Sequence, residues 1–226
     1  HQWLKNGFVF AGLLFSQLWS DAAIVQNVLL AFAAFCCAAS IVYMFNDWHD
    51  RHLDALHPTK RNRPFASGAV TPAVGLSLAA LLLVGGIGLA LGNVVLQALL
   101  GAYLLVNVAY SLKLKTVPVV DVFIIASGFI LRLLAGTVAV GIAPSHWLLL
   151  TGMFVALFLG FSKRKAETFH AAGSQRAVLA HYTPALLDTL MGATMTAAMI
   201  AYSLFAISPE SQARHGERLA YTVPLV

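Results

Sequence analysis

The sequence predicts an all-α, multi-pass transmembrane helical bundle that forms a single domain over residues 1–226. Of the 226 residues, 59% are hydrophobic and 10% are charged, whereas about 25% of the residues in a typical soluble domain are charged. Several uncharged runs reach the roughly 20 apolar residues that a membrane-spanning helix needs. These two observations exclude a soluble globular core.

The individual spans follow from the points at which the apolar runs are interrupted. Gly92-Asn93 favours a turn and divides residues 64–112 into halves that are each about one bilayer thick. The same reasoning, applied along the whole chain, predicts spans near residues 7–20, 22–46, 72–91, 94–112, 119–141, 145–163 and 185–207. The last residues, 219–226, are typical of the start of an eighth span.

The two ends of the chain suggest a longer protein. The first residue is His1 and the last ones lie in an apolar stretch, so we expect this domain to be truncated at both ends. A signal peptide over residues 7–19, behind Lys5, is an alternative, but no small-residue cleavage site precedes Asp21.

The Lys and Arg residues are distributed unevenly between the two sides of the predicted membrane. One side, which includes the N-terminus, carries Lys5, Arg51, Lys60, Arg61, Arg63, Lys113, Lys115, Lys163, Arg164, Lys165 and Arg176. The other side carries Arg214 and Arg218. Positive charge in short loops accumulates in the cytoplasm, so we expect an inner (plasma) membrane protein with this basic face in the cytoplasm. The net charge of +5 therefore indicates orientation and anion attraction, not nucleic-acid binding.

An acidic motif follows the second predicted span, where Asn46-Asp47 leads to Asp50 and Asp54. On a helix, offsets of three and seven residues place the three carboxylates within about 60° of one another over roughly 10 Å. Such oxygen ligands suit Mg²⁺, which is usually shared between carboxylates and substrate phosphates. The motif predicts a Mg²⁺–diphosphate site, and the alternative is a solvated acidic helix end.

A basic loop comes directly after the acids, with Lys60, Arg61 and Arg63 close together between Pro58 and Pro64. Arg offers a planar fork for phosphate and Lys a mobile point charge. We therefore expect these residues to bind phosphate, although anchoring to lipid headgroups would also explain them.

The next loop on the same side repeats this pattern with Tyr110, Lys113, Lys115 and Asp121. The lysines are candidates for phosphate binding, Tyr110 for a hydrogen bond to substrate, and Asp121 for a catalytic metal or hydroxyl contact. Asp121 could instead be an acid favoured at a helix N-terminus by the helix dipole.

Further candidates lie deeper in the chain. Arg132 falls about 16 Å along the helix from Asp121, and a charge within a membrane usually faces a cavity or a partner. It could line a central pocket or form a structural ion pair. The remaining candidate substrate-binding residues are Lys5, Lys163, Arg164 and Glu167, and positive-inside anchoring is the alternative for Lys163 and Arg164.

A histidine-box iron site is a competing interpretation, because His49, His52 and His57 lie among the acids. A di-iron site of that type needs more imidazoles from other loops on the same side. Only His170 and His181 are available there, so the pattern favours the magnesium site.

Together these motifs resemble the UbiA superfamily of intramembrane prenyltransferases, whose first signature, NDxxDxxxD, is matched by Asn46, Asp47, Asp50 and Asp54. The resemblance covers essentially the whole chain and implies about nine spans in a full-length protein. The family's second signature carries two acids, but Ile125 stands four residues after Asp121. This departure puts ordinary prenyl transfer in doubt.

Within that superfamily the chain looks most like the decaprenyl-phosphate phosphoribosyltransferases. The blocks that carry this likeness are HQWLKN, HPTKRNRP, YSLKLKTVPVVDV, ASGFILRLLAG and SKRKAE. The resemblance implies a phosphoribosyl diphosphate donor, a polyprenyl phosphate acceptor and Mg²⁺, with attack of the lipid phosphate on the anomeric carbon. Two alternatives stay open: transfer from an isoprenyl diphosphate to an aromatic or other acceptor, and a lipid-phosphate carrier without Mg²⁺. The sequence also leaves a homo-oligomer open.

Overall fold

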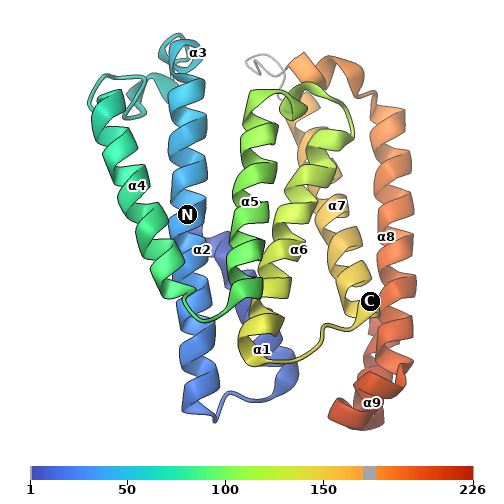
Figure 1. Ribbon diagram of the computed structural model, residues 1–226. Helices are drawn as coiled ribbons and strands as arrows, with labels where there is room; N and C mark the ends of the chain where they lie inside the picture. Colours follow the sequence, from blue (N-terminus) through green and yellow to red (C-terminus); the bar gives the residue numbers. More distant parts are fainter. Residues whose placement is uncertain (1, 170–176, 226) are drawn as a thin grey trace.

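The computed structural model describes residues 2–169 and 177–225, and every regular element in this part of the chain is a helix (Figure 1). Within the described residues, six helices are long and apolar enough to cross a membrane: α2 (Ala22–His49), α4 (Pro72–Leu89), α5 (Val94–Leu112), α6 (Val120–Val140), α7 (His146–Phe169) and α8 (Pro184–Ile207). They stand side by side, which confirms the predicted all-α membrane bundle.

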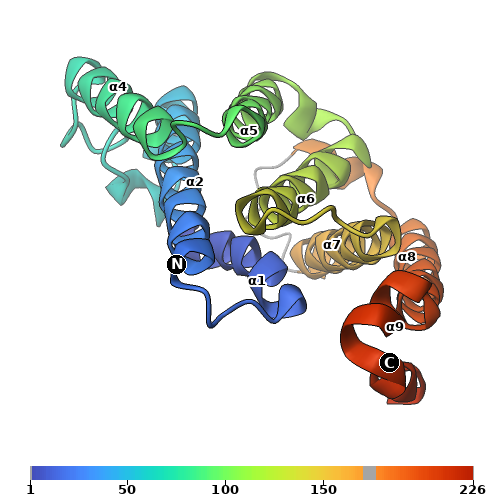
Figure 2. The ribbon, with the colours of Figure 1, turned by 60° about the horizontal axis from the view of Figure 1, so that its bottom comes forward.

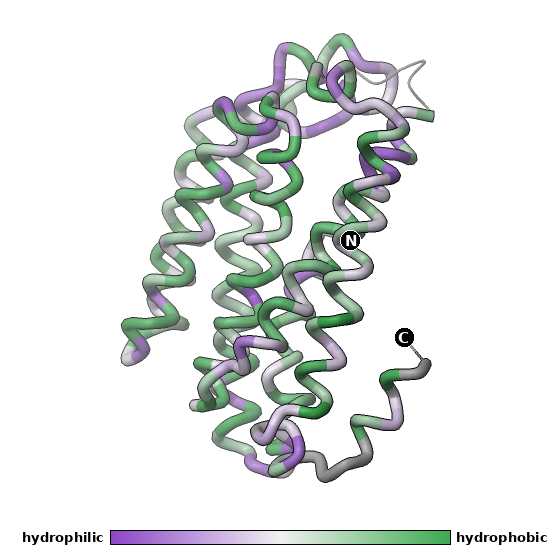
Figure 3. Tube along the Cα trace, turned by 90° about the vertical axis from the view of Figure 1, so that its right-hand side faces the viewer, coloured by the Kyte–Doolittle hydropathy of each residue, from purple (hydrophilic) through white to green (hydrophobic). Residues whose placement is uncertain are grey.

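Short helices join these spans or precede them. They are η1 (Gln2–Phe10), α1 (Ala11–Ser16), α3 (Arg51–Ala55), η2 (Lys60–Asn62), η3 (Leu114–Thr116), η5 (Ala177–His181), α9 (Pro209–His215) and η6 (Gly216–Leu225). We call the end of the bundle at which α2, α5 and α7 finish the charged end; it is uppermost in Figure 1. Hydrophilic segments gather there, whereas the helices below are mainly hydrophobic (Figure 3).

Local sequence signals explain where the spans begin. The side chains of Thr71, Asn93 and Thr183 accept hydrogen bonds from backbone N–H groups in the first turns of α4, α5 and α8. Such caps satisfy donors that have no partner within the helix. Gly92 before α5 has a φ of 84°, which glycine adopts readily, so the predicted break at Gly92-Asn93 is confirmed.

Helix α2 lies at the centre of one half of the bundle and contacts α4, α5 and α6, while α7 packs between α6 and α8 (Figure 2). The buried face of α2 is rich in alanine, including Ala31, Ala34, Ala38 and Ala39. Small residues let helix backbones approach closely where lipid provides no hydrophobic driving force. The core therefore runs along α2 and supports the acidic motif at its end.

The predicted first span is not one continuous α-helix, because η1 and the six residues of α1 replace it. In a 3₁₀ helix every third side chain lies on one face, and the buried residues Asn6 and Val9 of η1 follow that period. At Gly136 of α6 a Cβ would lie only 2.0 Å from the Val9 carbonyl oxygen. Close contact with α6 thus sets the conformation of this segment.

Lys5 was predicted on the charged side of the membrane, and this placement is wrong. Its neighbour Asn6 bonds to Arg132 and Cys36, which both lie near the middle of their helices. These contacts hold the start of the chain beside the middle of the bundle, where Figure 1 shows the N-terminus.

One further expectation needs correction. Helix α7 continues to Phe169, beyond the predicted end at 163, so its Lys and Arg residues lie on the helix itself. The residues predicted to start an eighth span lie, up to Leu225, in the 3₁₀ helix η6, which packs against α8, and a span that begins there stays a prediction. His170 and Arg176 lie outside the described residues, as do the side chains of Arg214 and Arg218.

Candidate functional site

The acidic motif lies at the charged end, where α2 stops at His49 and α3 begins at Arg51. A single nitrogen, Nη1 of Arg63, donates to Asp47 Oδ1 at 2.8 Å and to Asp54 Oδ2 at 2.9 Å. The basic loop therefore folds back onto the acids that precede it. We name Asp47, Asp50, Asp54, Arg63 and Lys115 the first charge cluster.

Asp50, the remaining acid of the motif, bonds to a different base. Asp50 Oδ1 accepts a hydrogen bond of 2.6 Å from Lys115 Nζ, which comes from the loop after α5. One turn earlier on α2, Asn46 Oδ1 accepts a bond of 3.3 Å from Ser111 Oγ. The first charge cluster thus joins both predicted basic loops to the end of α2.

The charges of this cluster suit a magnesium ion. Two carboxylates already share one cationic nitrogen, so they converge on a position where positive charge is stabilised. Among the described residues no three acidic, His or Cys side chains come close enough to hold one metal ion. Mg²⁺ needs fewer, because it commonly uses one or two carboxylates together with water and substrate phosphates. Whether Asp50 joins Asp47 and Asp54 as a ligand stays a prediction.

Other predicted phosphate-binding bases lie at the charged end, on the loops that follow α2 and α5. Lys60 is half-buried on η2, and Arg61 and Lys113 are exposed. Half-buried or exposed bases retain access to an anion that approaches from outside the bundle. Their placement agrees with phosphate binding and does not by itself distinguish it from headgroup anchoring.

A second charge cluster is formed by Asp121 of α6, Arg164 and Glu167 of α7, and Tyr182, which follows η5. Asp121 is completely buried, and its oxygens accept bonds from Arg164 Nε at 2.7 Å and from the Tyr182 hydroxyl at 2.6 Å. Arg164 also donates to Glu167 at 2.6 Å. Burial and the bond to Asp121 raise the pKa of Tyr182 above its usual value, so this hydroxyl stays protonated.

The second cluster differs from what the sequence predicts for its members. Arg164 is only 1% exposed and is held by two carboxylates, so a phosphate would have to replace a buried ion pair to reach it. Tyr110 lies near enough to interact electrostatically with Arg164. Lys163, the preceding residue on α7, is exposed and remains a candidate phosphate-binding residue.

Arg132 is buried in the middle of the bundle and forms a third polar group. Its guanidinium donates to Asn6 Oδ1 at 2.7 Å, to the Gly128 carbonyl at 2.7 Å and to the Tyr103 hydroxyl at 2.9 Å. It also stacks over the Tyr103 ring. These neutral partners come from η1, α5 and α6, and they link the N-terminal segment to the bundle.

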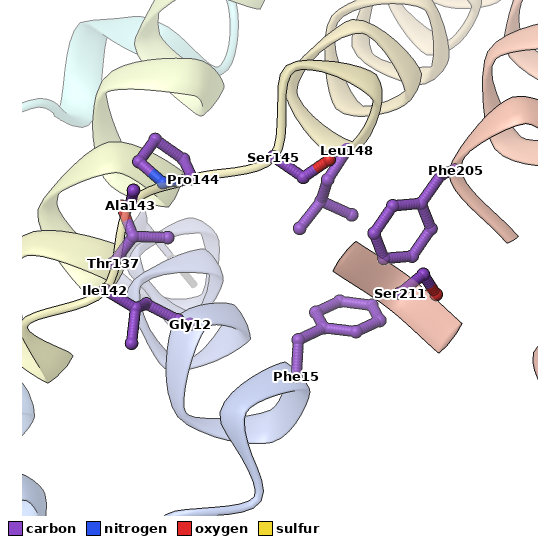
Figure 4. A pocket seen from close by; sticks show the side chains of 10 residues that line it. All are labelled: Gly12, Phe15, Thr137, Ile142, Ala143, Pro144, Ser145, Leu148, Phe205 and Ser211. Atoms are coloured by element: carbon purple, nitrogen blue, oxygen red, sulfur yellow. The ribbon is translucent and has the colours of Figure 1, made fainter. Parts of the chain in front are cut away.

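Two cavities lie away from these charges. One, of about 30 Å³, is at the opposite end of the bundle between α1, the α6–α7 loop, α8 and α9, and is lined by Phe15, Phe205 and Ser211 among others (Figure 4). The other, of about 230 Å³, is an apolar space between α2, α4 and α5. Neither is lined by a charged residue, so the candidate site is defined by the charged end.

Comparison with known proteins identifies the family. The model of the UbiA prenyltransferase family matches residues 7–210. The chain belongs to the UbiA family. A UbiA homolog from Archaeoglobus fulgidus, solved bound to GPP and Mg²⁺, superposes with a TM-score of 0.78 at 16% identity, over 99% of this chain and 81% of that one. The UbiA fold is therefore shared although the sequences have diverged.

More similar UbiA relatives carry a specific name. A decaprenyl-phosphate phosphoribosyltransferase of Corynebacterium glutamicum is 36% identical over 90% of this chain and 64% of its own length. Its counterpart in Mycolicibacterium smegmatis is 37% identical over 92% of this chain and 68% of its own length. The chain thus spans about two thirds of the length of these relatives.

Sequence reasoning missed the neutral residues that fix the charged ones. Tyr182 and Asn6 each bond to a predicted site residue, but they are separated from it by 61 and 126 positions. The contact between Asn6 and Arg132 could have been predicted, because a polar amide and a single charged residue within a membrane both need partners. For Tyr182 the sequence held no signal beyond its position before the helix-capping Thr183.

Proposed function

We propose that this protein transfers the 5-phosphoribosyl group from phosphoribosyl diphosphate to a polyprenyl phosphate such as decaprenyl phosphate, and releases diphosphate. The observation that carries the proposal is the 36–37% identity, over about nine tenths of the chain, to proteins named for that activity. The charged end supports it with acids and bases suited to a metal-bound diphosphate.

In this proposal Asp47 and Asp54, with Asp50 beside them, would hold Mg²⁺. A bound Mg²⁺ would neutralise charge that develops on the departing diphosphate. Arg63, which bonds to two of these carboxylates, is placed to donate to a phosphate oxygen of the donor. Lys60, Arg61, Lys113, Lys115 and Lys163 supply further charge around the same position.

The reaction exchanges one carbon–oxygen bond for another. An oxygen of the lipid phosphate attacks the anomeric carbon of ribose, and the bond from that carbon to the diphosphate oxygen breaks with inversion. The acceptor phosphate is already anionic, so no side chain has to remove a proton. The residues of the chain act by orienting the two substrates and by stabilising charge.

Orientation in the membrane belongs to the same proposal. The described bases at the charged end come from the loops after α2 and α5 and from the end of α7. Positive charge accumulates on the cytoplasmic side, so the charged end faces the cytoplasm in the inner membrane. A water-soluble donor reaches the site from there, and the lipid acceptor reaches it from the bilayer.

A second candidate is transfer of an isoprenyl group from its diphosphate, favoured by the likeness to the homolog solved with GPP and Mg²⁺. That likeness establishes the fold alone. Ile125 stands where the second signature has an acid, and Asp121 is bound to Arg164 and Tyr182. Both observations favour the phosphoribosyl donor.

The test is transfer of a labelled phosphoribosyl group to a lipid. The purified protein would be incubated with Mg²⁺, labelled phosphoribosyl diphosphate and decaprenyl phosphate, with Asp50→Ala and an EDTA-treated sample as controls. We expect labelled lipid from the unmodified protein and none from either control. Label transferred only from an isoprenyl diphosphate would replace this proposal with the second candidate.

A further inference from the structure

A strained turn immediately precedes Asp121. Val119 has a φ of 68° and a ψ of −49°, a conformation that is an outlier for a β-branched residue. The Val120 N–H donates to the Pro118 carbonyl at 2.8 Å, which closes a γ-turn around Val119. This form of γ-turn is rare and strained. It persists only if the surrounding structure fixes it.

The Val119 carbonyl accepts backbone bonds from Val122 and Phe123 at the start of α6, and one side-chain hydroxyl group holds the N–H side of the turn. The Val119 N–H donates to the Tyr182 oxygen at 2.7 Å, and the Tyr182 hydroxyl donates in turn to Asp121 at 2.6 Å. Tyr182 is 4% exposed, so water does not compete readily for either bond. Val119 and Asp121, at the start of α6, are therefore both tied to the segment before α8.

The turn also ends the loop that carries two predicted phosphate-binding lysines. Residues 113–119 run from the end of α5 to the turn, and η3 within this loop contacts both α6 and η5. Lys115 of the loop bonds to Asp50 in the first charge cluster. The position of Val119 therefore influences where Lys115 meets the acids, although these residues belong to different clusters.

We propose that Tyr182 is a positioning residue that holds the basic loop 113–119, through the strained turn at Val119, in the place where Lys115 faces Asp50. The functional part of this inference rests on the proposed transfer reaction, because the loop would act on the phosphates of the donor. Tyr182 itself touches no reacting atom.

The alternative is that Tyr182 only supports the buried pair of Asp121 and Arg164. The substitution Val119→Gly separates the two roles. Glycine adopts positive φ without strain, so in the double variant the turn at position 119 would no longer depend on Tyr182. The bond from residue 182 to Asp121 would still be missing in that double variant.

The experiment measures transfer kinetics for the unmodified chain, Tyr182→Phe, Val119→Gly and the double variant. Tyr182→Phe keeps the ring and removes both bonds, so we expect the KM for phosphoribosyl diphosphate to rise about tenfold, with a smaller change in kcat. Val119→Gly alone should stay within about threefold of the unmodified protein, and the double variant should return close to it. A double variant as impaired as Tyr182→Phe would overturn the proposal.

A spectroscopic readout tests the turn independently of activity. A nitroxide attached through Thr116→Cys, at an exposed position of η3, reports the mobility of the loop, with protein that retains Thr116 as the control for labelling of Cys36 and Cys37. We expect Tyr182→Phe to mobilise the label and added Val119→Gly to restore it. A spectrum that Tyr182→Phe leaves unchanged contradicts the inference.

These experiments distinguish a failure of the proposed function from a failure of the inference about Tyr182. If no variant transfers a phosphoribosyl group, the proposed function fails while the spectra still decide whether Tyr182 holds the loop. If Tyr182→Phe prevents folding, the inference requires that Val119→Gly restore it. A double variant that also fails to fold would count against a role through the turn.

Discussion

The first and second charge clusters contain the same kinds of side chain at the same end of the bundle, yet they differ in burial. Asp47 and Asp50 are each 22% exposed and Asp54 is 6% exposed, and their partners Arg63 and Lys115 come from loops and are 37% and 27% exposed. Asp121 and Arg164 are almost completely enclosed by helices. Partly exposed pairs can exchange partners when a ligand arrives, whereas enclosed pairs keep theirs.

This difference indicates that the two clusters have different roles. In the first, the carboxylates can pass from a loop guanidinium to a metal ion without unfolding any helix. In the second, the same exchange would leave a charge without a partner in a region of low dielectric, which is costly. We therefore propose substrate binding for the first cluster and support of α6 and α7 for the pair of Asp121 and Arg164 in the second.

The largest effect is expected from breaking the buried pair. Arg164→Met leaves Asp121 without its counter-charge, and we predict a loss of about 3–5 kcal/mol in the free energy of unfolding. Denaturation of the detergent-solubilised protein measures it. Lys165→Met is the matched control, since its pair with Asp188 is more exposed and should contribute less than about 1 kcal/mol. An Arg164→Met protein of unchanged stability would contradict the structural role.

Substitution in the first cluster should lower activity strongly and stability only slightly. We predict that Asp47→Asn lowers kcat/KM for transfer by about 100-fold or more, the scale of losing one preorganised electrostatic contact. Its free energy of unfolding should change by less than about 1 kcal/mol, because the pair is partly exposed. Asp188→Asn, at the same end of the bundle, should retain activity. Similar losses in both variants would show that the assay reports general charge at this end.

Loss of Asn6, a neutral partner of Arg132, should have an intermediate effect on the free energy of unfolding. Asn6→Leu removes the acceptor for Arg132 Nε and leaves a buried charged donor unpaired, so we predict a destabilisation of about 1.5–3 kcal/mol. Ser40→Ala removes the exposed bond from Trp3 to the same N-terminal segment and should cost less than about 1 kcal/mol. Equal unfolding midpoints for the two variants would exclude a special role of the Arg132 contacts.

The smallest effect concerns competition between Arg63 and the metal. In the absence of substrate, Arg63 occupies the two carboxylates that we assign to Mg²⁺, so Arg63→Met should tighten metal binding about two- to fivefold. Titration with Mn²⁺, followed by electron paramagnetic resonance, measures the affinity. Weaker metal binding in Arg63→Met would mean that Arg63 organises the carboxylates.

The sequence predicted the spans of α2, α4, α5, α6 and α8 to within a few residues, because apolar length and capping residues are local properties. It did not predict the pairing within the charged end. Arg63 joins Asp47 and Lys115 joins Asp50 across 16 and 65 positions, and such contacts depend on how the helices pack. The roles of the individual site residues therefore remain predictions, whereas the fold is established.

The N-terminal segment shows a different limit of sequence reasoning. Its apolar composition predicts a span over residues 7–20, but the close approach of Val9 to Gly136 and the bonds of Asn6 determine a 3₁₀ segment instead. The strained turn at Val119 was equally hidden, because valine normally disfavours that conformation. Tertiary contacts override local preference at both positions.

The most direct test of the different roles of the two clusters is an experimental structure of this protein with Mg²⁺ and diphosphate. We predict metal–oxygen distances of about 2.0–2.1 Å to Asp47 or Asp54, with Arg63 moved onto a phosphate oxygen and Asp121 still bonded to Arg164 and Tyr182. A metal ion bound to Asp121, with Arg164 displaced, would contradict the account.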